Sequence, residues 1–148
     1  EIIGRSYSGF ESFIIIDRGQ ADGITAAMSL AKDEGLLGRV FEVGRNASKV
    51  MLIDDPNSRV SVAIQRTREQ GTLIGMGAGL CKIMYLSPAS DVQPGDIVIS
   101  SGLGALDPKG VIVGEVEKVI REPRALDTSA LVRPSCDLFK IEEALCIE

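Results

Sequence analysis

The sequence predicts an all-β protein made of two packed, six-stranded antiparallel β-barrels that are related by internal duplication. Apolar residues recur with period two over short segments, and turn residues interrupt these segments about every 8 to 12 positions. Helical periodicity is nearly absent. Residues 1–66 also reappear in altered form further along the chain, which indicates two copies of one small design. We therefore expect a first barrel over residues 1–66 and a second barrel over residues 67–148.

The predicted strands follow in order from this alternation and from the turns between them. In the first copy, residues 33–35 form a tight connection that ends in glycine, and residues 54–58 form a rigid one around a proline. The strands of this copy are expected near residues 1–4, 12–17, 27–31, 36–43, 49–53 and 59–65. Those of the second copy are expected near residues 72–75, 81–86, 97–100, 111–120, 129–132 and 144–147.

The fourth strand of each copy carries a glycine at the matching position, Gly38 in the first copy and Gly114 in the second. A glycine inside a strand weakens packing, so its natural use is a sharp bend or the close approach of another backbone. Small barrels have such corners, and their closure also removes the exposed strand edges of short sheets. The two glycines therefore favour the two-barrel architecture.

Apolar side chains on the opposite face of the same strand indicate a protein interface. Leu37, Phe41 and Val43 alternate with the face that carries Gly38. Apolar side chains on the outside of a barrel must either cover the neighbouring barrel or meet a partner. Phe41 and Val43 are therefore candidate residues for the contact between the barrels or for a protein interaction.

Aromatic residues in the first copy add two further candidates. The chain has only two tyrosines, four phenylalanines and no tryptophan. Tyr7 and Phe10 lie in a segment rich in serine and glycine, so we expect them to be exposed and available to a partner. Packing in the core is the favoured interpretation for Phe13.

The net charge argues against a nucleic-acid-binding protein. The chain has 16 basic and 21 acidic residues and a formal net charge of −5, whereas affinity for nucleic acid depends largely on cationic side chains. The only local basic cluster contains Arg59, Arg66 and Arg68, and such a cluster is typical of a solvated strand face. Nucleic acid is therefore not an expected partner.

Neither a membrane span nor a disulfide framework is evident. The longest purely aliphatic or aromatic run, residues 13–16, is far shorter than the roughly 20 residues that a membrane-spanning helix requires. The three cysteines, Cys81, Cys136 and Cys146, form no C-x-x-C pair, so buried free thiols are expected. No segment of this chain is therefore expected to span a membrane.

Two six-stranded barrels are also the architecture of chymotrypsin-like proteases, whose catalytic cleft lies between the barrels. Such a protease needs a histidine as general base, and the chain has none. A serine–lysine hydrolase remains as the alternative, with Ser100 or Ser101 as nucleophile and Lys82 or Lys109 as base. The absence of histidine and of paired cysteines also argues against a metal site. No cofactor is expected.

Several ordered motifs resemble those of one family, the rod shape-determining proteins MreC. The most specific is the run Ile53-Asp54-Asp55-Pro56-Asn57-Ser58-Arg59-Val60-Ser61-Val62. The other resembling segments, in chain order, are residues 17–23, 35–40, 70–77, 100–104 and 108–114. The resemblance covers essentially the whole chain.

The resemblance implies a non-catalytic scaffold of the bacterial elongasome that organises peptidoglycan synthesis enzymes and maintains rod cell shape. It implies binding to the transpeptidase PBP2, cooperation with MreD, MreB and RodZ, and self-association into dimers or filaments. Family members carry a short cytoplasmic end, one membrane helix and a coiled coil before this region. The implied location is therefore the periplasmic side of the inner membrane, with this chain as a soluble fragment.

Overall fold

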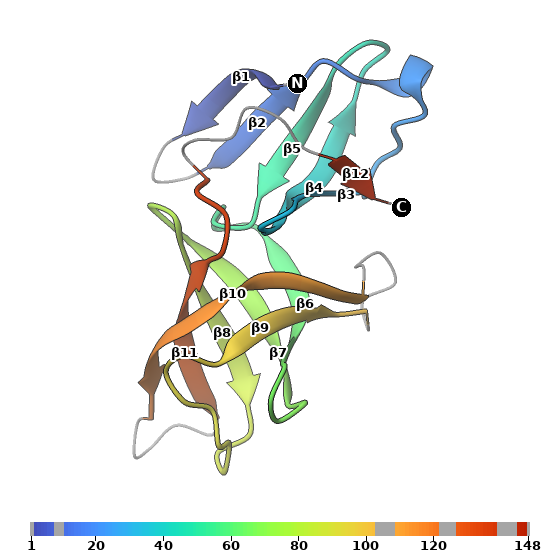
Figure 1. Ribbon diagram of the computed structural model, residues 1–148. Helices are drawn as coiled ribbons and strands as arrows, with labels where there is room; N and C mark the ends of the chain where they lie inside the picture. Colours follow the sequence, from blue (N-terminus) through green and yellow to red (C-terminus); the bar gives the residue numbers. More distant parts are fainter. Residues whose placement is uncertain (1, 8–10, 103–108, 122–126, 139–144, 148) are drawn as a thin grey trace.

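The chain is built almost entirely of β-strands (Figure 1). The computed structural model describes residues 2–7, 11–102, 109–121, 127–138 and 145–147. A short 3-10 turn, Gln20–Asp22, lies between the second and third strands. The strands are β1 (Ile2–Tyr7), β2 (Ser12–Ile16), β3 (Ser29–Lys32), β4 (Gly35–Val43), β5 (Ser48–Leu52), β6 (Arg59–Ile64), β7 (Gln70–Gly77), β8 (Leu80–Leu86), β9 (Ile97–Ser101), β10 (Lys109–Ile120), β11 (Thr128–Pro134) and β12 (Leu145–Ile147). The all-β prediction is confirmed, and each of these strands overlaps a predicted one.

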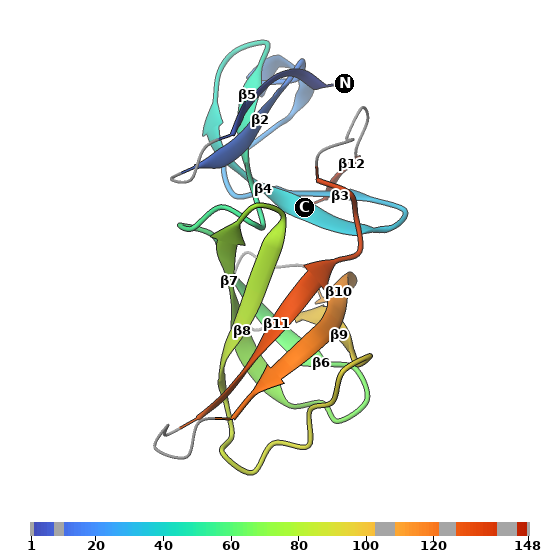
Figure 2. The same ribbon diagram turned by 90° about the vertical axis from the view of Figure 1, so that its left-hand side faces the viewer.

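The strands form two antiparallel sheets. One is a six-stranded sheet with the order β1-β2-β5-β4-β3-β12, and the other is a closed barrel with the order β10-β11-β8-β7-β6-β9. Figures 1 and 2 show the first sheet stacked on one end of the barrel, so that the molecule is elongated. Below, the first is called the open sheet.

The prediction of two packed six-stranded barrels is confirmed for the second unit but only in part for the first, whose six-stranded sheet does not close among the described residues. Among the described residues, β1 pairs only with β2 and β12 pairs only with β3. Closure requires the first and last strands to meet with a matching tilt and stagger. The alternation of apolar residues records which side of a strand is buried but carries no information on that meeting.

Two strands also lie in a different sheet from the one that the repeat suggests. β6 belongs to the barrel, although the sequence places it in the first copy. β12 joins the open sheet after the chain has left the barrel. The two sheets therefore do not coincide with residues 1–66 and 67–148. A domain boundary between residues 66 and 67 stays a prediction.

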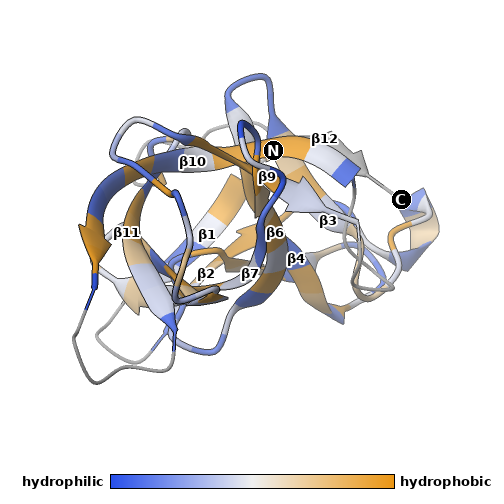
Figure 3. Cartoon of the chain, turned by 90° about the horizontal axis from the view of Figure 1, so that it is seen from below, coloured by the Kyte–Doolittle hydropathy of each residue, from blue (hydrophilic) through white to orange (hydrophobic). Residues whose placement is uncertain are grey.

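Alternating apolar residues form the core of both sheets. Ile14 of β2 and Val50 of β5 are fully buried in the open sheet, and Ile83 of β8 and Val132 of β11 are fully buried in the barrel. These residues belong to one cluster of buried apolar side chains that runs through both units. Figure 3, which views the molecule from below, shows hydrophobic and hydrophilic residues along the same barrel strands, as expected for strands with one buried face.

The predicted role of the two matching glycines is confirmed. A Cβ atom on Gly38 would collide with the carbonyl oxygen of Met51 on the neighbouring strand. A Cβ atom on Gly114 would collide with the carbonyl oxygen of Arg133 in the same way. Both positions therefore need glycine because another backbone approaches closely.

The turn after β5 joins the open sheet to the barrel through two buried carboxylates. Asp55 accepts hydrogen bonds from the backbone N–H groups of Ser12 and Asn57, both at 2.7 Å. Asp54 accepts one from the N–H of Gly79 at 3.0 Å, in the hairpin between β7 and β8. Both aspartates are almost completely buried. Asp55 thus binds the open sheet, and Asp54 binds the barrel.

Close backbone contact tightens this junction. A Cβ atom on Gly75 of β7 would collide with the backbone of Asp54 and Asp55. A second link lies on the opposite side, where the Cys136 thiol donates to the carbonyl oxygen of Gly35 at 3.3 Å. The open sheet is therefore attached to the barrel at two separate places.

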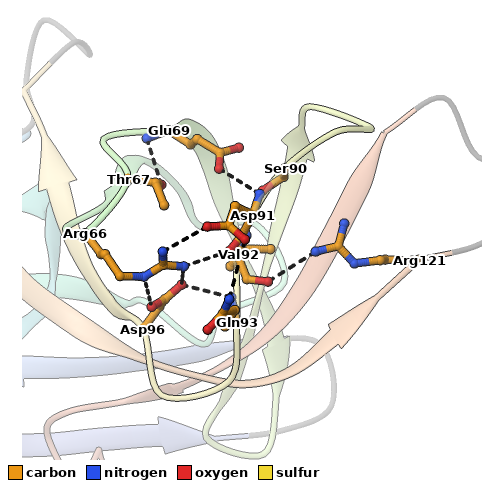
Figure 4. Close-up of polar contacts among 9 residues, drawn as sticks. All are labelled: Arg66, Thr67, Glu69, Ser90, Asp91, Val92, Gln93, Asp96 and Arg121. Carbon is orange, nitrogen blue, oxygen red and sulfur yellow. Dashed lines mark hydrogen bonds and ion pairs between the residues drawn. The ribbon is translucent and has the colours of Figure 1, made fainter.

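At the far end of the barrel, Arg66 holds the connection between β8 and β9 (Figure 4). Its guanidinium donates two hydrogen bonds of 2.9 Å to the Asp96 carboxylate and one of 3.0 Å to the Asp91 carboxylate. These bonds lower the pKa of Asp96 and of Asp91 and raise the pKa of Arg66. Arg66 is exposed, but its guanidinium is paired with two carboxylates of the same chain.

Replacing Asp55 with alanine should lower the free energy of unfolding by about 2 to 3 kcal/mol, because the buried N–H of Ser12 loses its charged acceptor. Urea titration of both proteins measures the difference. Asp33→Ala, in an exposed turn, is the control and should change stability by less than about 0.5 kcal/mol. Equal losses in the two variants would contradict a junction role for Asp55.

Acid should remove the stabilisation that Arg66 supplies. Because the folded-state pKa of Asp96 and of Asp91 lies below the ordinary value of 3.8, their contribution is present above that pH and is lost as pH falls through the folded values. Thermal unfolding of wild type and Arg66→Met between about pH 7 and pH 2 tests this. The difference in melting temperature should shrink steadily below about pH 4, and a constant difference would refute the assignment.

Candidate functional site

The outer face of the open sheet carries a row of partly exposed side chains. Phe13 on β2 lies opposite Met51 on β5, and Met51 lies opposite Arg39 on β4. All three are half-buried, whereas the next residues on β2 and β5, Ile14 and Val50, are fully buried on the inner face. The period-two alternation of the strands thus turns this row toward the solvent.

A β-bulge adds Phe41 to this row. The pairing of β4 with β5 shifts between Val40 and Glu42, so that Phe41 is an extra residue on its strand. A bulge redirects the side chain of the inserted residue. The Phe41 ring is 44% exposed and meets the Phe13 ring edge to face, with centroids 6.0 Å apart and an interplanar angle of 75°. The two rings thus form one aromatic surface.

Lys49 completes the surface on β5. Its Nζ atom lies 5.3 Å from the centroid of the Phe13 ring, in a cation–π contact, and 3.5 Å from the carboxylate of Glu42. We call the set Phe13, Arg39, Phe41, Lys49 and Met51 the Phe41 face. It combines two aromatic rings and a thioether with two cations.

A cavity of about 180 Å³ lies beside the Phe41 face, where the open sheet meets the start of the barrel. Strands β3, β4 and β5 contribute to one side, and the turn before β6 and β6 itself contribute to the other. Its lining residues are Ser29, Leu36, Gly38, Arg39, Phe41, Met51, Asn57, Ser58, Arg59 and Val60. Residues from both units therefore build one depression.

Two arginines give this cavity its charge. Burial lowers the pKa of Arg39, because its guanidinium is partly removed from water. Arg59 is exposed, and its Nη1 atom donates to the carbonyl oxygens of Pro56 at 2.9 Å and Ser58 at 2.8 Å. The turn between β5 and β6 thus holds the Arg59 side chain at the rim.

The structure separates the four interaction candidates that the sequence suggests. Phe41 is exposed at the centre of the face described above, whereas Val43 is half-buried and packs against the core. Tyr7 is the last residue of β1, where its backbone pairs with Ser12, and Phe10 lies outside the described residues. Partner binding by any of the four stays a prediction.

Sequence reasoning misplaces two neighbours of these candidates. Leu37 was expected beside Phe41 on the outer face, but it is fully buried, because the start of β4 is covered on both sides at the junction. Phe13 was expected in the core but lies half-buried on the outer face. Alternation places Arg39 on the same side of β4 as Phe41, but it does not show that register sets Arg39 beside Met51 or that Arg59 reaches the cavity from β6 of the barrel.

The structure lends no support to the hydrolase alternative, although it places one of the considered serine–lysine pairs on neighbouring strands. Ser100 is fully buried, and its hydroxyl oxygen accepts a hydrogen bond from the N–H of Val111 at 2.9 Å. A substrate has no access to that hydroxyl. Ser101 is half-buried and pairs with Lys109 in the ladder between β9 and β10, whereas Lys82 lies on β8, which is not a neighbour of β9.

Within the described part of the chain, no group of three or more histidine, cysteine, aspartate or glutamate residues is arranged to hold a metal ion. No helix within those residues is long and apolar enough to cross a membrane. Cys81 and Cys136 are buried free thiols, as expected, and burial raises the pKa of both.

Curated relatives of the chain are cell shape-determining proteins named MreC. The protein from Caulobacter vibrioides is 35% identical over 117 residues, which cover 79% of this chain and 34% of that protein. The Escherichia coli protein is 26% identical over 150 residues, which cover 99% of this chain and 40% of that protein. The chain thus spans less than half the length of these two relatives.

Solved structures agree with this relationship. MreC from Pseudomonas aeruginosa matches with a TM-score of 0.94 and 27% identity over 100% of this chain and 96% of that one. The major periplasmic domain of the "cell shape-determining filament MreC" matches with a TM-score of 0.77 and 28% identity, over 92% of this chain and 85% of that one. A chain in the complex between Penicillin-Binding Protein (PBP2) and MreC from Helicobacter pylori has a TM-score of 0.64 at 16% identity, which shows the fold alone.

The family model extends over nearly the whole chain. The model of the rod shape-determining protein MreC, barrel core, matches residues 2–148. This match agrees with the strand order, with the buried turn after β5 and with the relatives above. The chain therefore belongs to the family of rod shape-determining proteins MreC, a family of shape-determining structural proteins.

Proposed function

We propose that the chain is the non-catalytic docking module of a scaffold that organises peptidoglycan synthesis enzymes and maintains rod cell shape, with a transpeptidase of the PBP2 type as its main partner. The observation that carries the proposal is the Phe41 face, which presents paired aromatic rings to the solvent. The complex between PBP2 and MreC from Helicobacter pylori supports a partner of this class.

The composition of the Phe41 face suits a protein partner. Binding energy at protein interfaces concentrates in a few aromatic and arginine residues that become buried, surrounded by a polar rim. Phe41 and Phe13 supply the aromatic centre, and Lys49 and Arg39 supply the polar edge. Because the rings are already packed against each other, little side-chain freedom is lost on binding.

The remaining features of the proposal concern the whole protein, since this chain is less than half of the two relatives compared. We place it on the periplasmic side of the inner membrane, held there by an anchor outside this chain. MreD, MreB and RodZ are further proposed partners, and enzymatic activity is not part of the function. This assignment rests on membership of the family.

Phe41→Ala should weaken binding to the cognate transpeptidase by roughly 30-fold, which corresponds to about 2 kcal/mol for the loss of a central aromatic residue. Isothermal titration calorimetry with the periplasmic part of the enzyme measures the affinity. Stability should change little, because the ring is 44% exposed.

The matched control is Tyr85→Ala, which removes a 66% exposed aromatic ring from β8 in the barrel. This variant should bind the transpeptidase as wild type does. Folding of both variants is checked by circular dichroism. Wild-type affinity of a folded Phe41→Ala protein would reject the Phe41 face as the docking surface.

Self-association into dimers or filaments forms part of the same proposal. The open sheet supports it, because among the described residues β1 and β12 each have one edge without a paired strand. Light scattering should show a mass that rises with protein concentration. Replacing Ile3, which is 60% exposed on β1, with lysine should reduce the rise. A constant monomer mass in wild type would remove this part of the proposal.

A further inference from the structure

The cavity beside the Phe41 face has the size of one bulky apolar side chain. Its volume is about 180 Å³, and a cavity of roughly 150 Å³ lined by apolar side chains is able to bind benzene. Leu36, Gly38 and Val60 are buried at its base, and Phe41 and Met51 stand at its side. A leucine or phenylalanine side chain from a partner would therefore fill it.

The charge around this cavity is the reverse of the charge of the chain. The formal net charge is −5, yet the cavity lining contains two arginines and no aspartate or glutamate. Lys49 on the adjoining Phe41 face is paired with the Glu42 carboxylate and adds no net charge. Two arginines without an acidic residue in the lining favour an acidic partner segment and disfavour the face-to-face pairing of two such cavities.

Arg59 is oriented for an anion. Its Nη1 atom donates hydrogen bonds to the carbonyl oxygens of Pro56 and Ser58. Within the described part of the chain, Arg59 forms no ion pair, and neither its Nε nor its Nη2 atom donates a hydrogen bond. An arginine fixed at one nitrogen loses less side-chain entropy when its remaining donors bind a carboxylate.

Arg39 adds a second reason for an anion at this place. Burial lowers the pKa of its guanidinium, which means that the charged form is partly dehydrated. A carboxylate that arrives together with an apolar side chain would meet this guanidinium, which lines the cavity. The cavity and the two arginines thus select for the same kind of ligand.

We propose that this cavity takes a bulky apolar side chain of the partner protein whose neighbouring residues are aspartate or glutamate, with Arg59 and Arg39 binding the carboxylates. The inference rests on the proposed function and names the chemistry of the partner segment. It assigns recognition to the corner between the two sheets as well as to the aromatic rings.

Charge reversal at the rim tests the proposal. Arg59→Glu should weaken binding to the periplasmic part of the cognate transpeptidase at least tenfold, and Arg59→Gln should weaken it less. Arg45→Glu, which reverses an exposed arginine in the connection between β4 and β5, should change affinity less than about twofold. Circular dichroism and urea titration confirm that each variant is folded. Equal effects of Arg59→Glu and Arg45→Glu would overturn the proposal.

Two further measurements do not depend on a single variant. Wild-type affinity should fall between about 50 mM and 300 mM salt, and Arg59→Gln should reduce this dependence. A short peptide with phenylalanine between two glutamates should shift the NMR amide signals of residues 57–60, and the same peptide with glutamines should not. Salt-independent binding, or equal shifts with both peptides, would overturn the proposal.

The outcomes separate this inference from the proposed function. If Phe41→Ala weakens binding and Arg59→Glu does not, the acidic segment is refuted and the docking face stands. If neither variant weakens binding, both are refuted. If light scattering shows dimers that Arg59→Glu dissociates, a second copy of the chain occupies the cavity and the proposed occupant is wrong.

Discussion

The buried turn between β5 and β6 is the constraint on which the rest of the structure depends. Asp55 binds the first residue of β2, and Asp54 binds the hairpin between β7 and β8, so one short segment attaches to both sheets. Buried carboxylates are stable only when hydrogen bonds replace their water. The hydrogen bonds that these carboxylates accept therefore also set the position of the open sheet on the barrel, and Gly75 allows the two backbones to approach closely enough.

The same turn positions one side of the candidate site. Arg59 follows the turn directly, and its side chain is bonded back to the carbonyl oxygens of Pro56 and Ser58. Arg39 comes from the other side, on β4 of the open sheet. A shift of one sheet against the other would separate the two guanidinium groups and open the cavity. The proposed docking specificity and the attachment of the two sheets therefore both depend on this turn.

The proposed function resides on a surface and not in a catalytic cleft. The corner between the sheets resembles the position of a protease cleft, but it holds arginines beside aromatic and aliphatic side chains. The three arginines that are neighbours in the sequence show how the fold divides one cluster. Arg66 forms ion pairs with Asp91 and Asp96, and Arg59 lines the cavity. Arg68 is exposed in the connection between β6 and β7.

The sequence alone determined the twelve described strands, the need for glycine at Gly38 and Gly114, and the rigid turn around Pro56. These are local properties, because alternation and turn chemistry act within a few residues. Only the tertiary structure decided that the first sheet stays open, that β6 and β12 change sheets, that Leu37 is buried and that Phe41 packs against Phe13. Each of these depends on pairing between strands far apart in the chain, and a shift of one residue in register turns a side chain from the core to the solvent.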